Sequence, residues 1–266
     1  MEVSKLSGFD FSGQTVLITG GASGIGLEAA SIFAECGASV VIADIDQDNI
    51  DSAIGQLDGH HVSVHCDVSD EYSVNQMVTE TIKGLGQIDV LINCAGIADA
   101  FLPTTKQSKQ SWQRVIDINL TGTYLTCRAV APVMLKQRNG VIINVSSIAG
   151  LAGMPNRNAY TASKHGVAGI TKSLSGEWSS QGIRVIAIAP GYVKTPMVAE
   201  LIDKGQLDEK TISQRTPMGR LATPREIGNV MAFLASPLAS YITGTVISVD
   251  GGYIGHGGAE PIADIN

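Results

Sequence analysis

The sequence has little charge. Asp, Glu, Lys and Arg make up 16% of its 266 residues, against about 25% in an average globular protein. Hydrophobic residues make up 44%, so the chain has apolar surface to bury both in its own core and against another subunit. This composition favours a homo-oligomer. The net charge is -7 and no basic cluster occurs, which argues against nucleic acids and anionic membranes as partners.

The sequence also lacks the patterns of metal sites, disulfide frameworks and membrane segments. Its four cysteines lie far apart and form no CxxC pair: Cys36, Cys66, Cys94 and Cys127. We interpret them as buried free thiols and expect no metal. No apolar run approaches the roughly 18 residues of a membrane span, and residues 1–13 contain no apolar core of a signal peptide. These features predict a cytoplasmic protein.

Short apolar segments alternate with longer amphipathic ones. The apolar segments cover residues 15–19, 39–43, 62–66, 88–93, 141–145, 183–189 and 246–249, and the amphipathic ones cover about 24–36, 47–56, 70–83, 111–136, 159–180 and 224–234. Segments that are apolar on both faces are typical of parallel strands covered by helices on both sides. The alternation predicts an α/β protein with a doubly wound Rossmann fold: a seven-stranded, mostly parallel sheet with helices on both faces. The length fits a single domain over residues 1–266.

Residues 192–216 break this alternation. They contain Pro196 and a predicted helical piece over residues 198–204. Long insertions after a strand often form lids over a site. We therefore expect a substrate lid at about residues 192–216.

A glycine-rich segment joins the first predicted strand to the first predicted helix. It contains Gly20, Ser23, Gly24, Ile25 and Gly26 in a GxxxGxG spacing. Glycines at this place let backbone N–H groups approach a pyrophosphate at the N-terminus of the helix. A tight turn without a ligand is the alternative, because the motif by itself is weakly specific.

The second predicted strand ends at Asp44, which Ile45 follows. A carboxylate at this place accepts hydrogen bonds from the adenosine ribose hydroxyls and repels a 2′-phosphate. No Arg or Lys occurs between residues 20 and 56 to hold such a phosphate. The alternative is a helix-capping role, for which Asp46 is also suited. Together with the glycine turn, Asp44 predicts NAD as the cofactor.

The next two predicted strands also end in polar or small residues. The residues concerned are Asp67, Val68, Asn93, Ala95 and Gly96. The carboxyl ends of parallel strands meet at the edge of the sheet where doubly wound folds bind ligands. We expect all five residues to lie beside the cofactor.

Tyr160 and Lys164 are four residues apart in a predicted helix, so their side chains share one face. Tyrosine is ordinarily a poor base at neutral pH, but an ammonium ~4 Å away stabilises a phenolate by up to about 4 kcal/mol. Such a phenol can act as a general base. Ser147 follows a buried strand and can donate a hydrogen bond to a substrate oxygen. The alternative is an ordinary exposed pair on a helix, because YxxxK is a short motif.

The order of these motifs resembles that of the short-chain dehydrogenase/reductase family. TGGASGIG at residues 19–26, NCAG at 93–96, INVSSIAG at 143–150, YTASK at 160–164 and APGYVKT at 189–195 occur in the family's order and spacing. The resemblance covers about residues 11–252 and implies hydride transfer between a nicotinamide and an alcohol or carbonyl carbon. Ser147, rather than Ser146, matches the family's serine by its spacing from Tyr160. Cys94 and Ile188 stand where asparagine is commoner, and neither change removes a group that the chemistry needs.

The resemblance also implies roles for single residues. The family's catalytic tetrad is matched by Asn119, Ser147, Tyr160 and Lys164. Lys164 is expected to bind the nicotinamide ribose, and Asn119 to hold a water that connects Lys164 to solvent. The nicotinamide pocket is expected to be lined by Pro190, Gly191, Val193 and Thr195. Members of the family usually form dimers or tetramers, and we expect a homotetramer here. The small residues that follow Tyr160 in the predicted helix fit a subunit interface: Ala162, Gly166, Ala168 and Gly169.

Arg157 lies three residues before Tyr160, in a loop expected to border the substrate cavity. Its guanidinium would clamp a carboxylate, sulfonate or phosphate of the substrate, with Lys194 assisting. Alternatively, Arg157 points to solvent or to a neighbouring subunit, which we favour because surface arginines are common.

The leading functional hypothesis is NAD-dependent oxidation of a secondary alcohol in a polyol, a sugar or another small hydroxy compound. A clamping Arg157 would make the substrate an anionic hydroxy compound instead, carrying a carboxylate or sulfonate. Biosynthetic reduction of a 3-oxoacyl group is a further alternative, although it usually requires NADPH and a basic docking surface. A non-catalytic dinucleotide-sensing protein is the least favoured, because a sensor has no use for Ser147, Tyr160 and Lys164.

Overall fold

The computed structural model describes residues 9–256. The expectation for the N-terminus concerns residues 1–13, of which residues 1–8 lie outside the described residues. Within residues 9–256, none of the helices is long and apolar enough to cross a membrane.

Seven strands form one sheet in the order β3-β2-β1-β4-β5-β6-β7. They are β1 (Thr15–Thr19), β2 (Ser39–Asp44), β3 (Val62–His65), β4 (Val90–Asn93), β5 (Gly140–Val145), β6 (Ile183–Pro190) and β7 (Val246–Val249). Every pairing between these strands is parallel. The chain first adds strands on one side of β1 and then on the other, so the order reverses between β1 and β4. Ligands of open α/β sheets bind at such a reversal.

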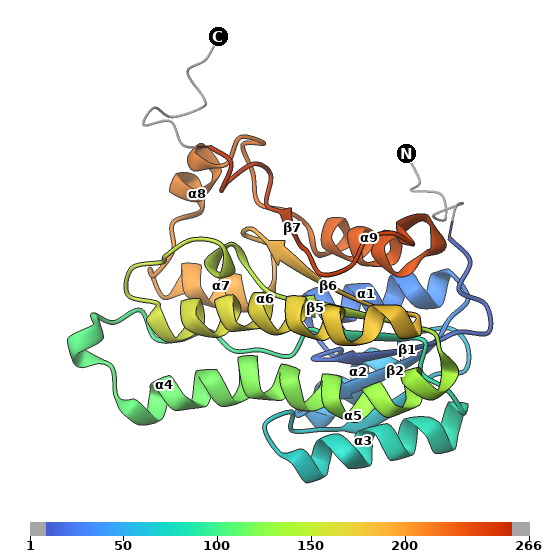
Figure 1. Ribbon diagram of the computed structural model, residues 1–266. Helices are drawn as coiled ribbons and strands as arrows, with labels where there is room; N and C mark the ends of the chain where they lie inside the picture. The colour runs from blue at the N-terminus through green and yellow to red at the C-terminus, as the bar shows by residue number, and fades with distance from the viewer. Residues whose placement is uncertain (1–8, 257–266) are drawn as a thin grey trace.

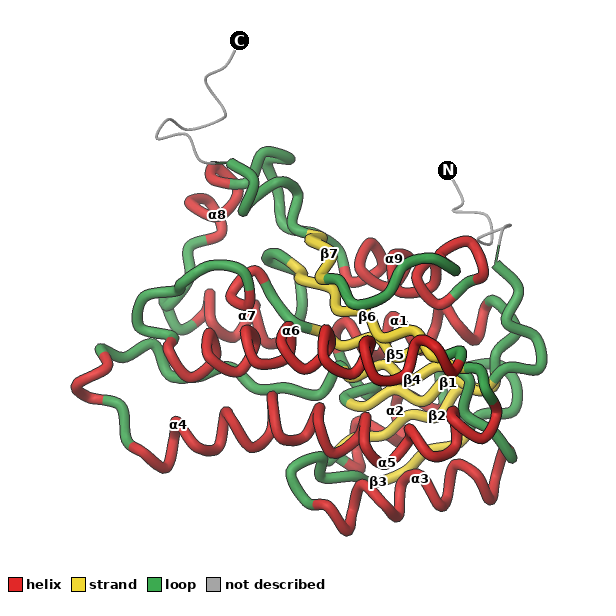
Figure 2. Tube along the Cα trace, viewed as in Figure 1, coloured by secondary structure: helices red, strands yellow, loops and turns green. Residues whose placement is uncertain are grey.

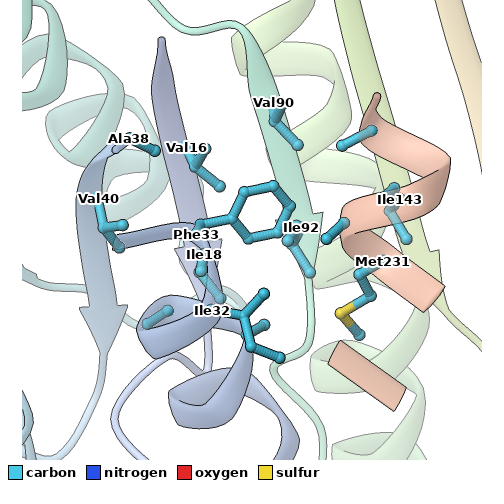
Figure 3. Packing of buried hydrophobic residues seen from close by; sticks show 14 of the residues in the cluster. Val16, Ile18, Ile32, Phe33, Ala38, Val40, Val90, Ile92, Ile143 and Met231 are labelled. Atoms are coloured by element: carbon cyan, nitrogen blue, oxygen red, sulfur yellow. The ribbon is translucent and has the colours of Figure 1, made fainter. Parts of the chain in front are cut away.

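The strands are apolar on both faces because helices cover both faces. Alternate residues of a strand point to opposite sides, and in β1 Val16 and Ile18 enter one buried cluster whereas Leu17 enters the other. Figure 3 shows the first cluster, where Phe33 of α1 and Met231 of α9 pack against the sheet. The predicted two-sided burial is confirmed for the central strands.

The two edge strands differ from that prediction. Ser63 and His65 of β3 are exposed, and β7 has no fully buried residue. An edge strand has a neighbour on one side only, so part of its surface remains accessible in a single chain.

Nine α-helices flank the sheet in the described residues (Figures 1 and 2). They are α1 (Gly24–Glu35), α2 (Gln47–Ile54), α3 (Glu71–Leu85), α4 (Lys109–Ile116), α5 (Gly122–Gln137), α6 (Asn158–Trp178), α7 (Pro196–Asp203), α8 (Glu209–Arg215) and α9 (Pro224–Ala235). Helices α1, α2 and α9 supply the helical residues of the first cluster, and α3 and α5 those of the second.

Two helical features differ from the sequence prediction. The single helix predicted over residues 111–136 is divided into α4 and α5 by a π-helical turn, Asp117–Thr121, although the whole continues as one rod in Figure 1. The segment predicted as a lid contains a second helix, α8, after α7. Asp208 starts α8 by accepting hydrogen bonds from the backbone N–H groups of Lys210 and Thr211.

Candidate active site

A cavity of about 350 Å³ lies at the carboxyl ends of the strands. Segments that follow β1 to β6 contribute to its wall, as the predicted topology requires. The lining includes most of the predicted site residues: Gly20, Ser23, Gly24, Ile25, Asp44, Ile45, Asp67, Val68, Ala95, Gly96, Ser147, Tyr160, Lys164, Pro190, Gly191, Val193 and Thr195. The structure therefore brings residues from six separate parts of the chain to one site.

The glycine turn is shaped by close approaches of the backbone. Gly20 has φ +64°, and a Cβ there would lie 2.7 Å from the backbone of Ala95. A Cβ on Gly26 would lie 2.1 Å from the Gly20 carbonyl oxygen, so Gly26 allows α1 to pack against the turn. Gly26 does not line the cavity, and its contact with the cofactor stays a prediction beside this packing role.

The N-terminus of α1 faces the cavity with donors available. Ser23 is the N-cap residue, and among the described residues its side chain caps no backbone N–H of the helix. Ser23, Gly24 and Ile25 all line the cavity. The first N–H groups of a helix have no partner within the helix and favour an anion.

Asp44 presents a fixed carboxylate to the same cavity. Its Oδ2 accepts a hydrogen bond from the backbone N–H of Ala22 at 3.2 Å, and its Oδ1 accepts one from that of Ile45 at 2.8 Å. The capping role belongs to Asp46, which accepts from the Asn49 N–H at the start of α2. The alternative considered for Asp44 is therefore wrong, because the two carboxylates have separate partners.

Asn93 is the last residue of β4. Its side chain donates to the side-chain Oδ1 of Asn144 at 2.8 Å and accepts from the Thr126 hydroxyl at 2.6 Å. It is 4% exposed and does not line the cavity. The side chain thus belongs to a buried network that joins β4, β5 and α5, and a cofactor contact of Asn93 stays a prediction.

The two serines after β5 have different roles. The Ser146 hydroxyl donates to the Lys164 carbonyl oxygen at 2.9 Å, which ties the strand to α6. The Ser147 hydroxyl accepts from the Ala149 N–H at 3.1 Å and does not use its own proton in that contact. Ser147 thus keeps a donor for a ligand, as expected from its spacing to Tyr160.

Tyr160 and Lys164 lie in the first two turns of α6. Lys164 is 5% exposed, and its ammonium donates to the Val145 carbonyl oxygen at 2.8 Å. The Nζ atom lies 5.6 Å from the centroid of the Tyr160 ring. The pair is therefore not an ordinary exposed pair, because the cation is buried beside the phenol ring at the cavity wall.

Asn119 lies in the π-helical turn between α4 and α5 and is fully buried. Its Oδ1 accepts from the Ile97 N–H at 2.8 Å, and its Nδ2 donates to the Ile97 carbonyl oxygen at 3.0 Å. Asn119 thus fixes the loop after β4 and does not itself line the cavity. A Cβ built on Gly96 would lie 3.2 Å from Asn119 Oδ1, which is a tight contact, and 3.6 Å from Lys164 Nζ, which is an ordinary one, so Gly96 packs closely against both side chains.

Arg157 is largely buried and forms an ion pair within the chain. Its side chain is 13% exposed, and its Nε lies 3.0 Å from Oδ1 of the buried Asp99. The expectation that Arg157 points to solvent is wrong, and the guanidinium already has a carboxylate partner within the chain. Lys194, suggested as its helper, pairs instead with Glu209 of α8 at 3.3 Å.

Sequence reasoning missed several lining residues. Met197 and Val198 of α7 cover the cavity, and Arg114 and Ile118 reach it from the α4 region. Their i,i+4 spacing places Arg114 and Ile118 on one face, but nothing local indicates that this face lines the cavity. Burial raises the pKa of the Cys94 thiol to about 12 and that of Cys66 to about 11, so these two lining cysteines are neutral thiols.

Comparisons with known proteins agree with this geometry. A family model described as enoyl-(acyl carrier protein) reductase matches residues 20–254. The 3-oxoacyl-(acyl-carrier-protein) reductase FabG of Thermotoga maritima is 42% identical over 246 residues, which are 91% of this chain and 98% of the relative. The cis-4-hydroxycyclohexanecarboxylate dehydrogenase of Sinomonas cyclohexanicum is 41% identical over 91% of this chain and 97% of its own.

A solved structure shows the same fold. That structure, ElxO with NADP bound, has a TM-score of 0.86 and 34% identity, and the match covers 91% of this chain and 99% of that one. The relatives are reductases and dehydrogenases of hydroxy or keto groups, which identifies this protein as an oxidoreductase of that kind. The sheet, the motifs gathered at its carboxyl edge and these relatives lead to one conclusion: the chain belongs to the short-chain dehydrogenase/reductase family.

Proposed function

We propose that this protein is an NAD-dependent dehydrogenase that oxidises a secondary alcohol to a carbonyl compound. The observation that carries the proposal is one cavity shared by the glycine turn, Asp44, Ser147, Tyr160 and Lys164. This arrangement supports a dinucleotide site and an acid–base group that act on one bound ligand.

The lining residues fit a nicotinamide dinucleotide. The N-terminus of α1 offers backbone donors to a pyrophosphate, and the Asp44 carboxylate is oriented to accept from ribose hydroxyls. At the other end, Pro190, Gly191, Val193 and Thr195 follow β6 and form the wall expected to face the nicotinamide. When bound there, the oxidised dinucleotide supplies a hydride acceptor.

We assign the transfer of the alcohol proton to Tyr160. In oxidation, its phenolate oxygen takes the hydroxyl proton of the substrate, while the carbinol carbon loses a hydride and becomes a carbonyl carbon. Ser147 donates a hydrogen bond to the reacting oxygen and holds it beside the phenol. The buried Lys164 ammonium stabilises the phenolate by its charge. In reduction the same groups act in reverse, with Tyr160 donating the proton.

Asp44 supports NAD over NADP, because its carboxylate repels a 2′-phosphate. ElxO, a neighbour in fold, binds NADP, and Arg114 provides one exposed cation at the same cavity. Asp44 outweighs Arg114 in our proposal, because its carboxylate is fixed by backbone N–H groups whereas Arg114 is a solvated side chain.

A small neutral hydroxy compound, such as a polyol, sugar or cyclic alcohol, is the proposed substrate class. The internal pairing of Arg157 with Asp99 leaves less support for an anionic substrate, although the Sinomonas relative is named for a carboxylate. Reduction of a 3-oxoacyl group is the second candidate, and the 42% identity to the Thermotoga reductase favours it. A non-catalytic dinucleotide sensor stays the least favoured.

We further propose one cytoplasmic domain that self-associates to a dimer or a homotetramer. Support for self-association comes from exposed apolar side chains such as Leu238, which is 72% exposed, and Tyr241, which is fully exposed. The accessible edge strand β7 lies near them in sequence. The cytoplasmic location is supported by the four free cysteines.

One substrate panel tests the proposal. Cyclohexanol, threitol and cis-4-hydroxycyclohexanecarboxylate are offered with NAD or NADP, and ethyl acetoacetate with NADH or NADPH, with absorbance at 340 nm as the readout. Tyr160→Phe is expected to reduce turnover by ~10²–10⁴ while dinucleotide binding is retained. Tyr72→Phe, on the exposed surface of α3 and outside the cavity lining, is the matched control and is expected to behave as wild type. Turnover of the folded Tyr160→Phe variant close to that of wild type would refute the assigned role.

A further inference from the structure

Asp99, in the loop after β4, joins two parts of the site that the sequence does not connect. Its side chain is 4% exposed, and its two oxygens have different partners. Oδ1 accepts from Nε of Arg157 at 3.0 Å, and Oδ2 accepts from the backbone N–H of Tyr160 at 3.1 Å. One buried carboxylate thus contacts both the backbone of Tyr160 and the cation beside it.

The backbone contact supplies a cap that α6 lacks locally. Arg157 occupies the N-cap position, and a guanidinium has no acceptor for the N–H groups of the first turn. Asp99 provides that acceptor from 61 residues away in the chain. A carboxylate is also favoured at this place by the helix dipole. The position of Tyr160 along the helix axis is therefore fixed through Asp99.

The cation contact restrains the ring of Tyr160. The Arg157 guanidinium carbon lies 4.3 Å from the centroid of the Tyr160 ring and 4.6 Å from that of the Phe101 ring. A planar guanidinium stacks well on aromatic faces, and here it contacts two of them. Asp99 holds Arg157 in this position by its ion pair, so the ring of Tyr160 packs against a fixed surface.

Further contacts dock the loop onto the start of α6. The Asn158 amide donates to the Thr104 hydroxyl at 3.0 Å, and the Gln107 amide donates to the Asn156 carbonyl oxygen at 3.3 Å. The placement of Asp99 therefore does not depend on one contact alone.

We propose that Asp99 and Arg157 are positioning residues that hold the Tyr160 phenol in register for proton transfer. The proposal rests on the proposed function, because it requires Tyr160 to be the acid–base group. Neither residue is assigned a contact with substrate or dinucleotide. Displacements of about 1 Å can lower catalytic rates by roughly 10²-fold, so loss of this restraint is expected to affect turnover rather than binding.

The test uses Asp99→Asn, Arg157→Met, their double variant and Arg157→Lys. Asparagine keeps an acceptor but removes the charge, and methionine keeps the apolar length of the side chain. The double variant leaves no unpaired buried charge, which protects the folded state if a single variant is unstable. Arg128→Met is the matched control: Arg128 also pairs with a carboxylate, Glu71, and lies 6.0 Å from the Tyr124 ring centroid, but it is exposed and does not line the cavity.

We measure kcat, KM and the solvent deuterium isotope effect on kcat with the best alcohol of the panel, together with the dinucleotide Kd by protein fluorescence. The two single substitutions are expected to lower kcat about 10–100-fold and to raise the isotope effect, with Kd within about threefold of wild type. The double variant is expected to be no slower than the slower single variant, because the pair acts as a unit. Arg157→Lys is expected to recover part of the loss, since it restores a cation without the planar fork.

Three results would overturn the proposal: kcat within twofold of wild type, a lower kcat with an unchanged isotope effect, or multiplicative losses in the double variant. Failure of the proposed function looks different. If Tyr160→Phe retains turnover in the same assay, the acid–base assignment itself fails. If Tyr160→Phe is inactive while Asp99→Asn and Arg157→Met are fully active, only the positioning role fails.

Discussion

The coenzyme preference is expected to depend on one carboxylate, that of Asp44. Asp44→Asn removes its charge while keeping its shape and one acceptor oxygen. The backbone N–H of Ile45 can still donate to that oxygen, whereas the hydrogen bond from the Ala22 N–H to the other oxygen is lost. Both coenzymes meet this same altered turn, so the ratio of their efficiencies tests the charge rather than the local fold.

The expected size follows from the position of Asp44 at the cavity wall. A phosphate monoester carries about -1.5 to -2 charges at pH 7, and unit charges ~5.5 Å apart at an effective dielectric of ~20 interact by about 3 kcal/mol. Asp44 is half-buried, so solvent screening lowers the repulsion energy between its carboxylate and the phosphate. A net penalty of about 2–4 kcal/mol corresponds to a preference for NAD of roughly 30- to 1000-fold. Asp44→Asn is expected to reduce this preference at least about tenfold.

The assay compares kcat/KM for NAD and NADP in wild type, Asp44→Asn and Asp46→Asn. Asp46 is the matched control, because it carries the same charge two residues away but caps α2 instead of lining the cavity. Asparagine is also a good N-cap residue, so this control keeps α2 intact and is expected to change the coenzyme ratio less than about twofold. Equal efficiencies with NAD and NADP in wild type would refute the reasoning. Equal changes in both variants would show that the general field of the protein, and not Asp44, sets the preference.

Two further substitutions test the packing and the pH dependence. Gly26→Ala places a Cβ 2.1 Å from the Gly20 carbonyl oxygen, so it is expected to destabilise the fold by about 1–3 kcal/mol and to weaken dinucleotide binding. The control is Gly176→Ala in α6, where a Cβ meets nothing within 4 Å. Equal melting temperatures for the two variants would contradict this expectation. Hydrogen bonds from Arg220 and from a backbone N–H lower the pKa of Glu226 from 4.5 to about 2, so its ionised form stabilises the protein above about pH 4.5, and that contribution is lost as the pH falls toward 2. Glu226→Gln is therefore expected to lower Tm at pH 7 by no more than ~2–4 °C, because the pair of Arg220 and Glu226 is largely exposed. A Tm difference between variant and wild type that is the same at pH 7 and pH 3 would count against this linkage.

The sheet and its ligand-binding edge could be predicted because the signals are local. Runs such as Val16–Ile18 are apolar at consecutive positions, which only two covered faces explain. The glycine turn and Asp44 lie within one strand–helix–strand unit, so their spacing already describes their geometry. The motif order then extended the prediction to Ser147 and Tyr160, which are brought to the same edge by the parallel topology.

The remaining features depend on partners distant in the chain or on signals that are weak by themselves. Asp99 and Arg157 are 58 residues apart, and no local pattern pairs them. Asn119, in the π-helical turn, contacts the backbone of Ile97, 22 residues earlier in the chain, which periodicity does not register. Helix α8 had a signal in Asp208, whose side chain begins the helix, but a seven-residue helix inside an irregular segment has too little periodicity to stand out.

The loop after β4 connects the dinucleotide end of the site to its acid–base end. Its backbone at Ala95 would lie 2.7 Å from a Cβ on Gly20, both polar groups of the Ile97 backbone are bound by Asn119, and its Asp99 caps α6. A bulkier residue at Gly20 must therefore displace the loop, and the displacement reaches the start of α6. Substitutions in the glycine turn are expected to lower turnover as well as dinucleotide affinity, whereas substitutions of Asp99 change turnover alone. The two kinds of substitution differ in this way because α6 depends on the loop for its cap, whereas the glycine turn makes its own contacts with β1 and α1.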